Sequence, residues 1–160
     1  MIRVGLGVDV HAFAAPEDGR KLILGGVDIP FDRGLAGHSD ADVLAHAVTD
    51  ALLGAAGLED IGHYFPDTDA RWKDADSIVL LREVRRIVGG SWQVSNVDAV
   101  VLCERPKVRD HRDAMRRNLA SALEVDPSQV SVRGTTTERL GFTGRGEGIA
   151  AQAVCLLQKG

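Results

Sequence analysis

The chain has 160 residues, 44% of them hydrophobic and 18 of them glycine, which predicts a single domain over residues 1–160. Its formal net charge of −4 argues against nucleic acid as a partner, because nucleic-acid-binding surfaces need clustered Lys and Arg. No apolar run approaches the roughly 18 residues typical of a membrane-spanning helix, so we expect no membrane segment.

The first predicted elements are a strand and a hairpin. Residues 2–10 alternate in polarity and are rich in Val and Gly, which is typical of a strand, and the early Asp9 argues against a secretory signal peptide. Residues 21–31 form two apolar runs around Gly25-Gly26, which indicates a β-hairpin whose glycines supply positive φ.

A first helix is predicted after the polar connection over residues 34–42, where Ser39 or Asp40 can cap it. This helix is expected to end near Gly54 or Gly57. Its apolar stripe has the helical period and consists of Val43, Leu44, Ala47, Val48, Ala51 and Leu52.

A long polar loop over residues 60–73 precedes a second amphipathic helix. Asp76 or Ser77 can cap this helix, and Gly89-Gly90 ends it. A long loop in a compact domain is more often functional than a short one, so we expect part of it to contact a ligand.

The C-terminal half predicts three strands and one helix. Residues 92–102 and 149–157 are apolar strands, and residues 130–133 form a shorter one. Pro106 follows the first of these strands and breaks it, and residues 109–123 form a charged amphipathic helix. The complete order predicts an α+β fold, an α/β sandwich in which a mixed sheet of about four strands carries helices on one face, together with the small hairpin.

Asp9 and His11 are two residues apart on the first strand, so their side chains point to the same face and can bind one cation. His46, in the middle of the first helix, can supply a third ligand, and Asp50 one turn later can orient it. Three protein ligands leave a fourth tetrahedral position open, as in catalytic zinc sites. Non-haem Fe(II) oxygenases use the same ligand types, but the three predicted helices argue against that class.

Other segments have the composition of phosphate-binding loops. His38 lies just before the first helix, whose N-terminus favours anions. Residues 135–138, Thr-Thr-Thr-Glu, offer hydroxyl groups to phosphate, and Glu138 can bind a hard cation such as Mg²⁺. The glycine-rich loop 141–148 contains Arg145, a candidate anion ligand, but lacks the ending of a P-loop.

Five stretches of the sequence match one known family in the same order. They are GVDVHAF at 7–13, LILGGVDIP at 22–30, HSDADVLAHAVTDALLGAAGLEDIGHYFPDTD at 38–69, PK at 106–107 and TTTERLGFTGRGEGIA at 135–150. Together they resemble the 2-C-methyl-D-erythritol 2,4-cyclodiphosphate synthases over essentially the whole chain. The segment at 103–105, Cys-Glu-Arg, is more charged than is usual in that family.

The resemblance implies a metal-dependent phosphorus–oxygen lyase of the non-mevalonate isoprenoid pathway. Its substrate would be 4-diphosphocytidyl-2-C-methyl-D-erythritol 2-phosphate, which is cyclised to 2-C-methyl-D-erythritol 2,4-cyclodiphosphate with release of CMP. The resemblance also implies a homotrimer whose active sites lie between subunits, with the cytidine-binding loop over residues 103–109 from one chain and the zinc from its neighbour.

The resemblance assigns roles to individual residues. It implies zinc ligands at Asp9, His11 and His46. It implies a second divalent cation, Mg²⁺ or Mn²⁺, at Glu138 and catalytic groups at His38 and Thr136. The residues expected to contact substrate are Asp9, His11, His38, Ser39, Asp60, Gly62, Phe65, Asp69, Pro106, Lys107, Thr135, Thr136, Thr137, Glu138, Phe142 and Arg145.

A protein that binds CDP or an isoprenoid phosphate without chemistry is an alternative to the enzyme. A complete set of metal ligands beside a phosphate-binding loop favours the enzyme. With neither a signal peptide nor a membrane segment expected, we also expect a cytoplasmic protein.

Overall fold

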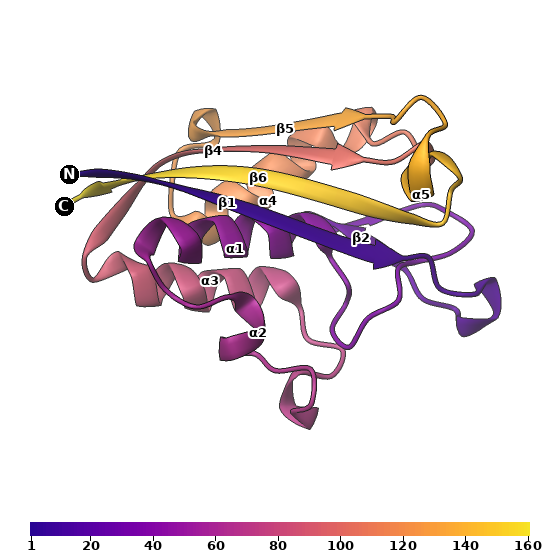
Figure 1. Cartoon of the computed structure of the whole chain (residues 1–160), viewed down its shortest axis with the longest axis horizontal. Helices are drawn as coiled ribbons and strands as arrows, with labels where there is room; N and C mark the ends of the chain where they lie inside the picture. The colour runs from indigo at the N-terminus through magenta and orange to yellow at the C-terminus, as the bar shows by residue number, and fades with distance from the viewer.

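The computed structural model describes residues 1–160 and contains a four-stranded sheet with the strand order β1-β6-β4-β5 (Figure 1). The strands are β1 (Ile2–Ala12), β4 (Trp92–Leu102), β5 (Val130–Thr135) and β6 (Gly148–Lys159). β6 is antiparallel to both β1 and β4, whereas β5 is parallel to β4. The predicted mixed sheet is confirmed, and β1 and β5 form its opposite edges.

Helices α1 (Val43–Ala56), α3 (Ser77–Gly89) and α4 (Arg112–Leu123) cover one face of this sheet (Figure 1). α1 packs directly on β1, because β1 has glycine where the helix approaches: a Cβ atom at Gly7 would lie 1.8 Å from the backbone oxygen of Ala47. The buried apolar side chains of the sheet and of these helices form the core. None of the helices is long and apolar enough to cross a membrane.

The predicted hairpin is confirmed as β2 (Leu22–Leu24) and β3 (Val27–Ile29). Gly25 and Gly26 join the two strands with φ of 55° and 72°, a region that glycine occupies without strain. The N–H groups of both glycines donate to the carboxylate of Asp42, at 2.9 and 2.7 Å, which ties the hairpin to the start of α1.

Asp42 is also the residue that caps α1. Its carboxylate accepts a hydrogen bond from the N–H of Ala45 at 2.9 Å, and burial raises its pKa to about 6. The prediction of a cap at Ser39 or Asp40 is therefore wrong, because the helix begins later than its sequence signals indicate. At the other end, Gly57 with φ 76° terminates the helix. This confirms the second of the two predicted ends, Gly54 and Gly57.

Short helical turns lie in segments predicted as loops. The segment 60–73 contains α2 (Ile61–Tyr64) and a 3₁₀ turn (Ala70–Trp72), and the glycine-rich loop contains α5 (Gly141–Gly144). The last predicted long helix begins with a 3₁₀ turn over Arg109–His111 before α4. Two further 3₁₀ turns lie at Pro16–Asp18 and Pro127–Gln129.

The second face of the sheet carries no helix of this chain (Figure 1), and along β1 it exposes apolar side chains. Side chains two residues apart on β1, and one opposite them on β6, expose large apolar groups on this face: Ile2, Val4, Leu6, Val8, Val10 and Val154. Leu6, for example, is 64% exposed. We call this surface the apolar β1 face.

Both termini lie at one end of the sheet, where the N–H of Lys159 donates to the carbonyl of Met1 at 3.0 Å (Figure 1). Asp9 and His11 lie toward the other end of β1. Because β1, β4 and β5 run in the same direction, their C-terminal ends all meet at that other end.

Candidate active site

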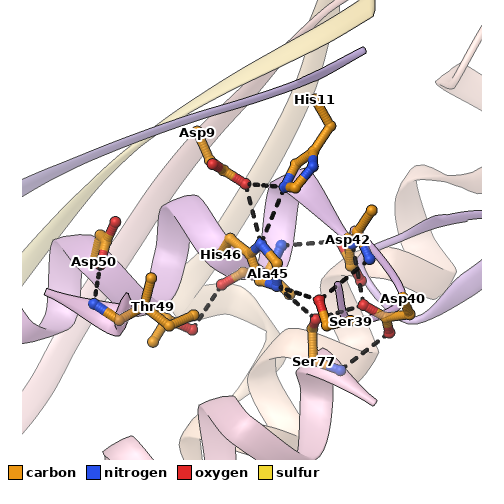
Figure 2. A network of polar contacts seen from close by, with 12 residues as sticks. Asp9, His11, Ser39, Asp40, Asp42, Ala45, His46, Thr49, Asp50 and Ser77 are labelled. Atoms are coloured by element: carbon orange, nitrogen blue, oxygen red, sulfur yellow. Dashed lines mark hydrogen bonds and ion pairs between the residues drawn. The ribbon is translucent and has the colours of Figure 1, made fainter. Parts of the chain in front are cut away.

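Asp9, His11 and His46 come together where β1 crosses α1 (Figure 2). Asp9 Oδ2 lies 2.9 Å from His11 Nε2 and 3.1 Å from His46 Nδ1, and these two nitrogens are 3.4 Å apart. Ligand atoms at about 2.1 Å from a tetrahedral ion are about 3.4 Å from one another. The three atoms therefore outline one face of a site that can hold a metal ion.

The hydrogen bonds of His11 show that this group suits a cation. Its Nδ1 lies 2.7 Å from the carbonyl oxygen of Ala36, which can only accept, so Nδ1 carries the proton. In the neutral ring, Nε2 then presents a lone pair to the Asp9 carboxylate. A proton or a metal ion between these two atoms makes the contact favourable, and two imidazoles with a carboxylate are a donor set that fits zinc.

The charges of the site agree with this interpretation. Burial by itself raises the pKa of Asp9, but hydrogen bonds to His11 and His46 outweigh it and lower that pKa to about 2. Burial also opposes protonation of His11, but the hydrogen bond and charge of Asp9 raise its pKa above the usual 6.5. Asp9 is therefore ionised at neutral pH and attracts a cation.

A cavity of about 400 Å³ opens beside these three residues, and we call it the metal cavity. Besides Asp9 and His11, the predicted substrate contacts that line it are His38, Ser39, Gly62 and Phe65. The lining residues that the sequence analysis missed are Gly37, Ile61, Pro66, Asp67, Trp72 and Leu80. Trp72 packs edge-on against Phe65 with ring centroids 5.0 Å apart. The sequence signal that could have identified Trp72 is its aromatic side chain in an otherwise polar loop.

Asp60 and Asp69 do not line the metal cavity. Asp60 caps α2 by accepting from the N–H of His63 at 3.0 Å. Asp69 accepts from the N–H of Arg71 at 3.0 Å and pairs with its guanidinium at 2.6 Å. Both carboxylates therefore order the loop, and their contact with substrate stays a prediction.

A second cavity of about 470 Å³ lies beside β5, at the opposite edge of the sheet, and we call it the arginine cavity. The predicted substrate contacts that line it are Pro106, Lys107, Thr135 and Thr136. Cys103, Val108 and Arg109 also line it and belong to the loop that the resemblance assigns to cytidine, whereas the sequence analysis missed Arg112, Arg133 and Gly134. Three arginines and a lysine give this cavity the positive charge that suits an anionic ligand.

Glu138 lies in a strained turn that follows β5. Glu138 and Arg139 both have positive φ, 54° and 63°, which costs free energy for residues other than glycine. The N–H of Arg139 donates to the carboxylate of Glu104 at 2.6 Å. Thr136 Oγ1 lies 3.4 Å from Glu138 Oε1, so the two predicted site residues are neighbours. The unusually charged segment at 103–105 thus holds the turn that carries Glu138.

Thr137, Phe142 and Arg145 lie outside both cavities. The hydroxyl of Thr137 bonds within its own loop, 2.7 Å from Thr143 Oγ1, and Arg145 pairs with Glu147 at 2.7 Å. Their contact with substrate stays a prediction.

Asp50 does not orient His46, and that prediction is wrong. Asp50 lies one turn after His46 on α1, beside the first residue of α2. Its Oδ1 accepts from the N–H of that residue, Ile61, at 2.8 Å. The residue closest to the outer nitrogen of His46 is Ser77, with Oγ 2.7 Å from Nε2 (Figure 2).

Comparisons with known proteins give consistent similarities. The sequence profile of the YgbB family matches residues 2–158. A curated 2-C-methyl-D-erythritol 2,4-cyclodiphosphate synthase from Rubrobacter xylanophilus is 80% identical over 157 residues, covering 98% of this chain and 95% of that protein. The structure of the bifunctional IspDF from Campylobacter jejuni matches with a TM-score of 0.94 and 44% identity, over 100% of this chain and 43% of that chain. A CDP complex of IspF from Plasmodium falciparum matches with a TM-score of 0.85 and 34% identity, over 99% and 96% of the two chains.

Proposed function

The chain belongs to the YgbB family and is a cyclodiphosphate synthase of isoprenoid biosynthesis, and we propose that its substrate is 4-diphosphocytidyl-2-C-methyl-D-erythritol 2-phosphate. An oxygen of the 2-phosphate attacks the β-phosphorus of the diphosphate. The bond from that phosphorus to the oxygen shared with the α-phosphate breaks. The products are 2-C-methyl-D-erythritol 2,4-cyclodiphosphate and CMP.

The observation that carries this proposal is the group of Asp9, His11 and His46 at the metal cavity. We assign Zn²⁺ to these ligands on the basis of the donor set. When bound, zinc supplies positive charge to the β-phosphate while charge develops on the leaving group. The attacking phosphate is already anionic, so the chain needs to position it rather than remove a proton.

His38 and Thr136 are proposed to position the reacting phosphates from the two cavities that they line. The neighbouring Thr136 and Glu138 oxygens support a second divalent cation, Mg²⁺ or Mn²⁺, at Glu138. Loss of the Thr136 hydroxyl in Thr136→Ala is expected to lower turnover by roughly 10²-fold, by analogy with the loss of one oxyanion-hole donor.

We further propose that each active site joins the metal cavity of one subunit to the arginine cavity of the next in a homotrimer. The arginine cavity is assigned to the cytidine diphosphate end, because its positive charge suits that group and a related structure contains CDP. The two cavities lie at opposite edges of one sheet, which favours their combination between subunits. The apolar β1 face offers surface for the subunits to bury.

A ³¹P NMR time course tests the activity directly. Purified protein with Zn²⁺ and Mg²⁺ is expected to replace the signals of the linear substrate with those of CMP and the cyclic diphosphate. Persistence of the linear diphosphate signals contradicts the proposal and supports a protein that only binds its ligand.

The variant His46→Ala tests the metal assignment in the same experiment. It is expected to stay folded but to lose both zinc and activity, as measured by circular dichroism, elemental analysis and the NMR assay. Full zinc occupancy in this variant would contradict the assignment of His46 as a ligand.

A further inference from the structure

The outer nitrogen of His46 contacts a side chain that belongs to neither cavity. His46 Nε2 lies 2.7 Å from Ser77 Oγ, and Ser77, the first residue of α3, is completely buried. Ser77 Oγ in turn donates to Asp40 Oδ1 (Figure 2). We infer that Ser77 and Asp40 are positioning residues that orient His46 for metal binding.

The direction of each hydrogen bond follows from its partners. Asp40 is a carboxylate and can only accept, so the Ser77 hydroxyl donates its single proton to it. The oxygen of Ser77 must then accept from His46, which places the imidazole proton on Nε2. The lone pair of His46 Nδ1 is thereby left facing Asp9 at 3.1 Å, where the cation is proposed.

Asp40 is itself held in a fixed position. Its Oδ2 accepts from the N–H of Ser77 at 3.0 Å, and its Oδ1 also accepts from the N–H of Asp42 at 3.1 Å. The N–H of Asp40 donates to the carbonyl of Ala75 at 3.1 Å. The carboxylate therefore joins the segment before α1 to the start of α3, and it fixes the rotamer of Ser77.

Ser39 is the other hydroxyl near His46, but its contact is weaker. Ser39 Oγ lies 3.3 Å from His46 Nε2, against 2.7 Å for Ser77. Ser39 is also only partly buried, and its Oγ accepts from the N–H of Ala41 at 3.3 Å. The shorter and fully buried contact identifies Ser77 as the partner that determines the tautomer.

This arrangement is a carboxylate–hydroxyl–imidazole chain behind a metal ligand. Such outer partners fix the ring orientation and make the ligand nitrogen more basic, and their loss typically weakens metal binding by roughly 10–100-fold. The inference rests on the proposed function in one respect, namely that the cation binds at His46 Nδ1.

Zinc affinity, measured by competition with a chromophoric chelator, tests the inference without use of the catalytic reaction. Ser77→Ala is expected to bind zinc roughly 10–100-fold more weakly than the wild type. Asp40→Asn removes the charge behind Ser77 and is expected to weaken binding in the same direction. The matched control is Thr49→Val, which removes a buried hydroxyl on α1 that donates to the Ala45 carbonyl at 2.7 Å. This variant should leave zinc affinity unchanged.

The outcomes separate this inference from the proposed function. Wild-type protein that binds no zinc overturns both. Wild-type protein that binds zinc with the same affinity as Ser77→Ala overturns only the role of Ser77.

A spectroscopic measurement covers the case in which Ser77→Ala does not fold. Long-range ¹H–¹⁵N spectra of the metal-free wild type, recorded at a pH where His46 is neutral, are expected to show His46 protonated on Nε2. Protonation on Nδ1, with Nε2 free, would overturn the inference without any variant.

Discussion

The two histidines of the metal group are fixed in different ways. His11 donates to a backbone carbonyl, that of Ala36, whereas His46 donates to a side chain, that of Ser77. A backbone partner cannot be removed by substitution, but a side-chain partner can. Metal affinity can therefore be adjusted at position 77 without a change in the ligands themselves.

At the residue scale, the pKa of His11 predicts how metal binding depends on pH. Because the folded-state pKa lies above 6.5, protonated His11 stabilises the metal-free protein below about pH 6.5, and this contribution is lost as pH rises through the folded-state pKa. Metal binding needs unprotonated His11, so it strengthens over the same range. The difference in Tm between zinc-loaded and metal-free protein should therefore grow from about pH 6 to about pH 8.

Thermal unfolding at a series of pH values, with zinc or with a chelator, measures this difference. The variant His11→Asn lacks both a zinc ligand and the titrating group, so its Tm should differ little between zinc and chelator at any pH. A difference in Tm that shrinks as pH rises would contradict the prediction.

The convergence of Asp9, His11 and His46 could be predicted from sequence, because strand alternation and helix position are local properties. The partner of His46 could not be predicted in this way. It depends on how α3 packs beside α1, and Asp50, the nearest candidate along the chain, points to α2 instead.

At the scale of elements, the contact between β1 and α1 depends on the absence of a side chain at Gly7. Gly7→Ala places a Cβ atom 1.8 Å from the Ala47 oxygen, so α1 has to move, and His46 moves with it. The expected destabilisation is roughly 1–3 kcal/mol or more, with a loss of zinc affinity. Urea unfolding and zinc titration measure the two effects.

Gly54→Ala is the matched control for this prediction. Gly54 lies on α1, the helix that packs against Gly7. A Cβ atom at Gly54 would have its nearest neighbour at 3.8 Å, which is an ordinary contact. This substitution should stabilise the protein by roughly 0.5–1 kcal/mol, because alanine favours a helix over glycine. Equal effects of the two substitutions would show that the contact at Gly7 is not the cause.

The turn with Glu138 and Arg139 at positive φ gives a second prediction at this scale. Glu104→Ala removes the acceptor that holds the Arg139 N–H, so the turn should spend less time in the conformation that presents Glu138. One lost hydrogen bond worth about 1 kcal/mol corresponds to a roughly fivefold higher Mg²⁺ concentration for half-maximal activity at saturating zinc.

The conservative variant Glu104→Gln keeps an acceptor oxygen and should need nearly the wild-type Mg²⁺ concentration. The Mg²⁺ dependence of the rate, measured for both variants, decides the matter. An unchanged requirement in Glu104→Ala would show that Glu104 does not act through Glu138.

Elements with strong local signals could be predicted well. The paired glycines of the hairpin and the apolar stripe of α1 are examples. α2 was missed because one helical turn, Ile61–Tyr64, is too short to show periodicity. The cap at Asp42 was missed because its carboxylate also accepts hydrogen bonds from the hairpin glycines Gly25 and Gly26. The local sequence around the helix start does not indicate this contact.

At the scale of the whole molecule, the proposal that active sites are shared between subunits predicts complementation. His46→Ala damages the metal cavity and Thr136→Ala the arginine cavity, and each homotrimer should be nearly inactive. When the two are co-expressed equally, about a quarter of the sites join two intact halves, so activity should return to about a quarter of the wild type. If each site lies within one subunit, mixing restores nothing.

The number of chains per particle can be measured on the same preparations, with the wild type as reference. Light scattering should give three chains per particle for both variants and for the mixture. The arginine cavity could be predicted only in part, from the loop over residues 103–109 and the threonines, because Arg112 and Arg133 reach it from α4 and β5, which lie apart in the sequence.

The two ends of the chain lie side by side at one margin of the sheet, away from both cavities. This position has an evolutionary consequence. A second catalytic unit can be tethered at Met1 or beyond Lys159 without crossing either entrance. In the bifunctional IspDF from Campylobacter jejuni, the region that matches this chain forms 43% of a longer chain. Genes for such a fold should therefore be suited to fusion with those of other enzymes, because linkage at this margin leaves the entrances of both cavities free.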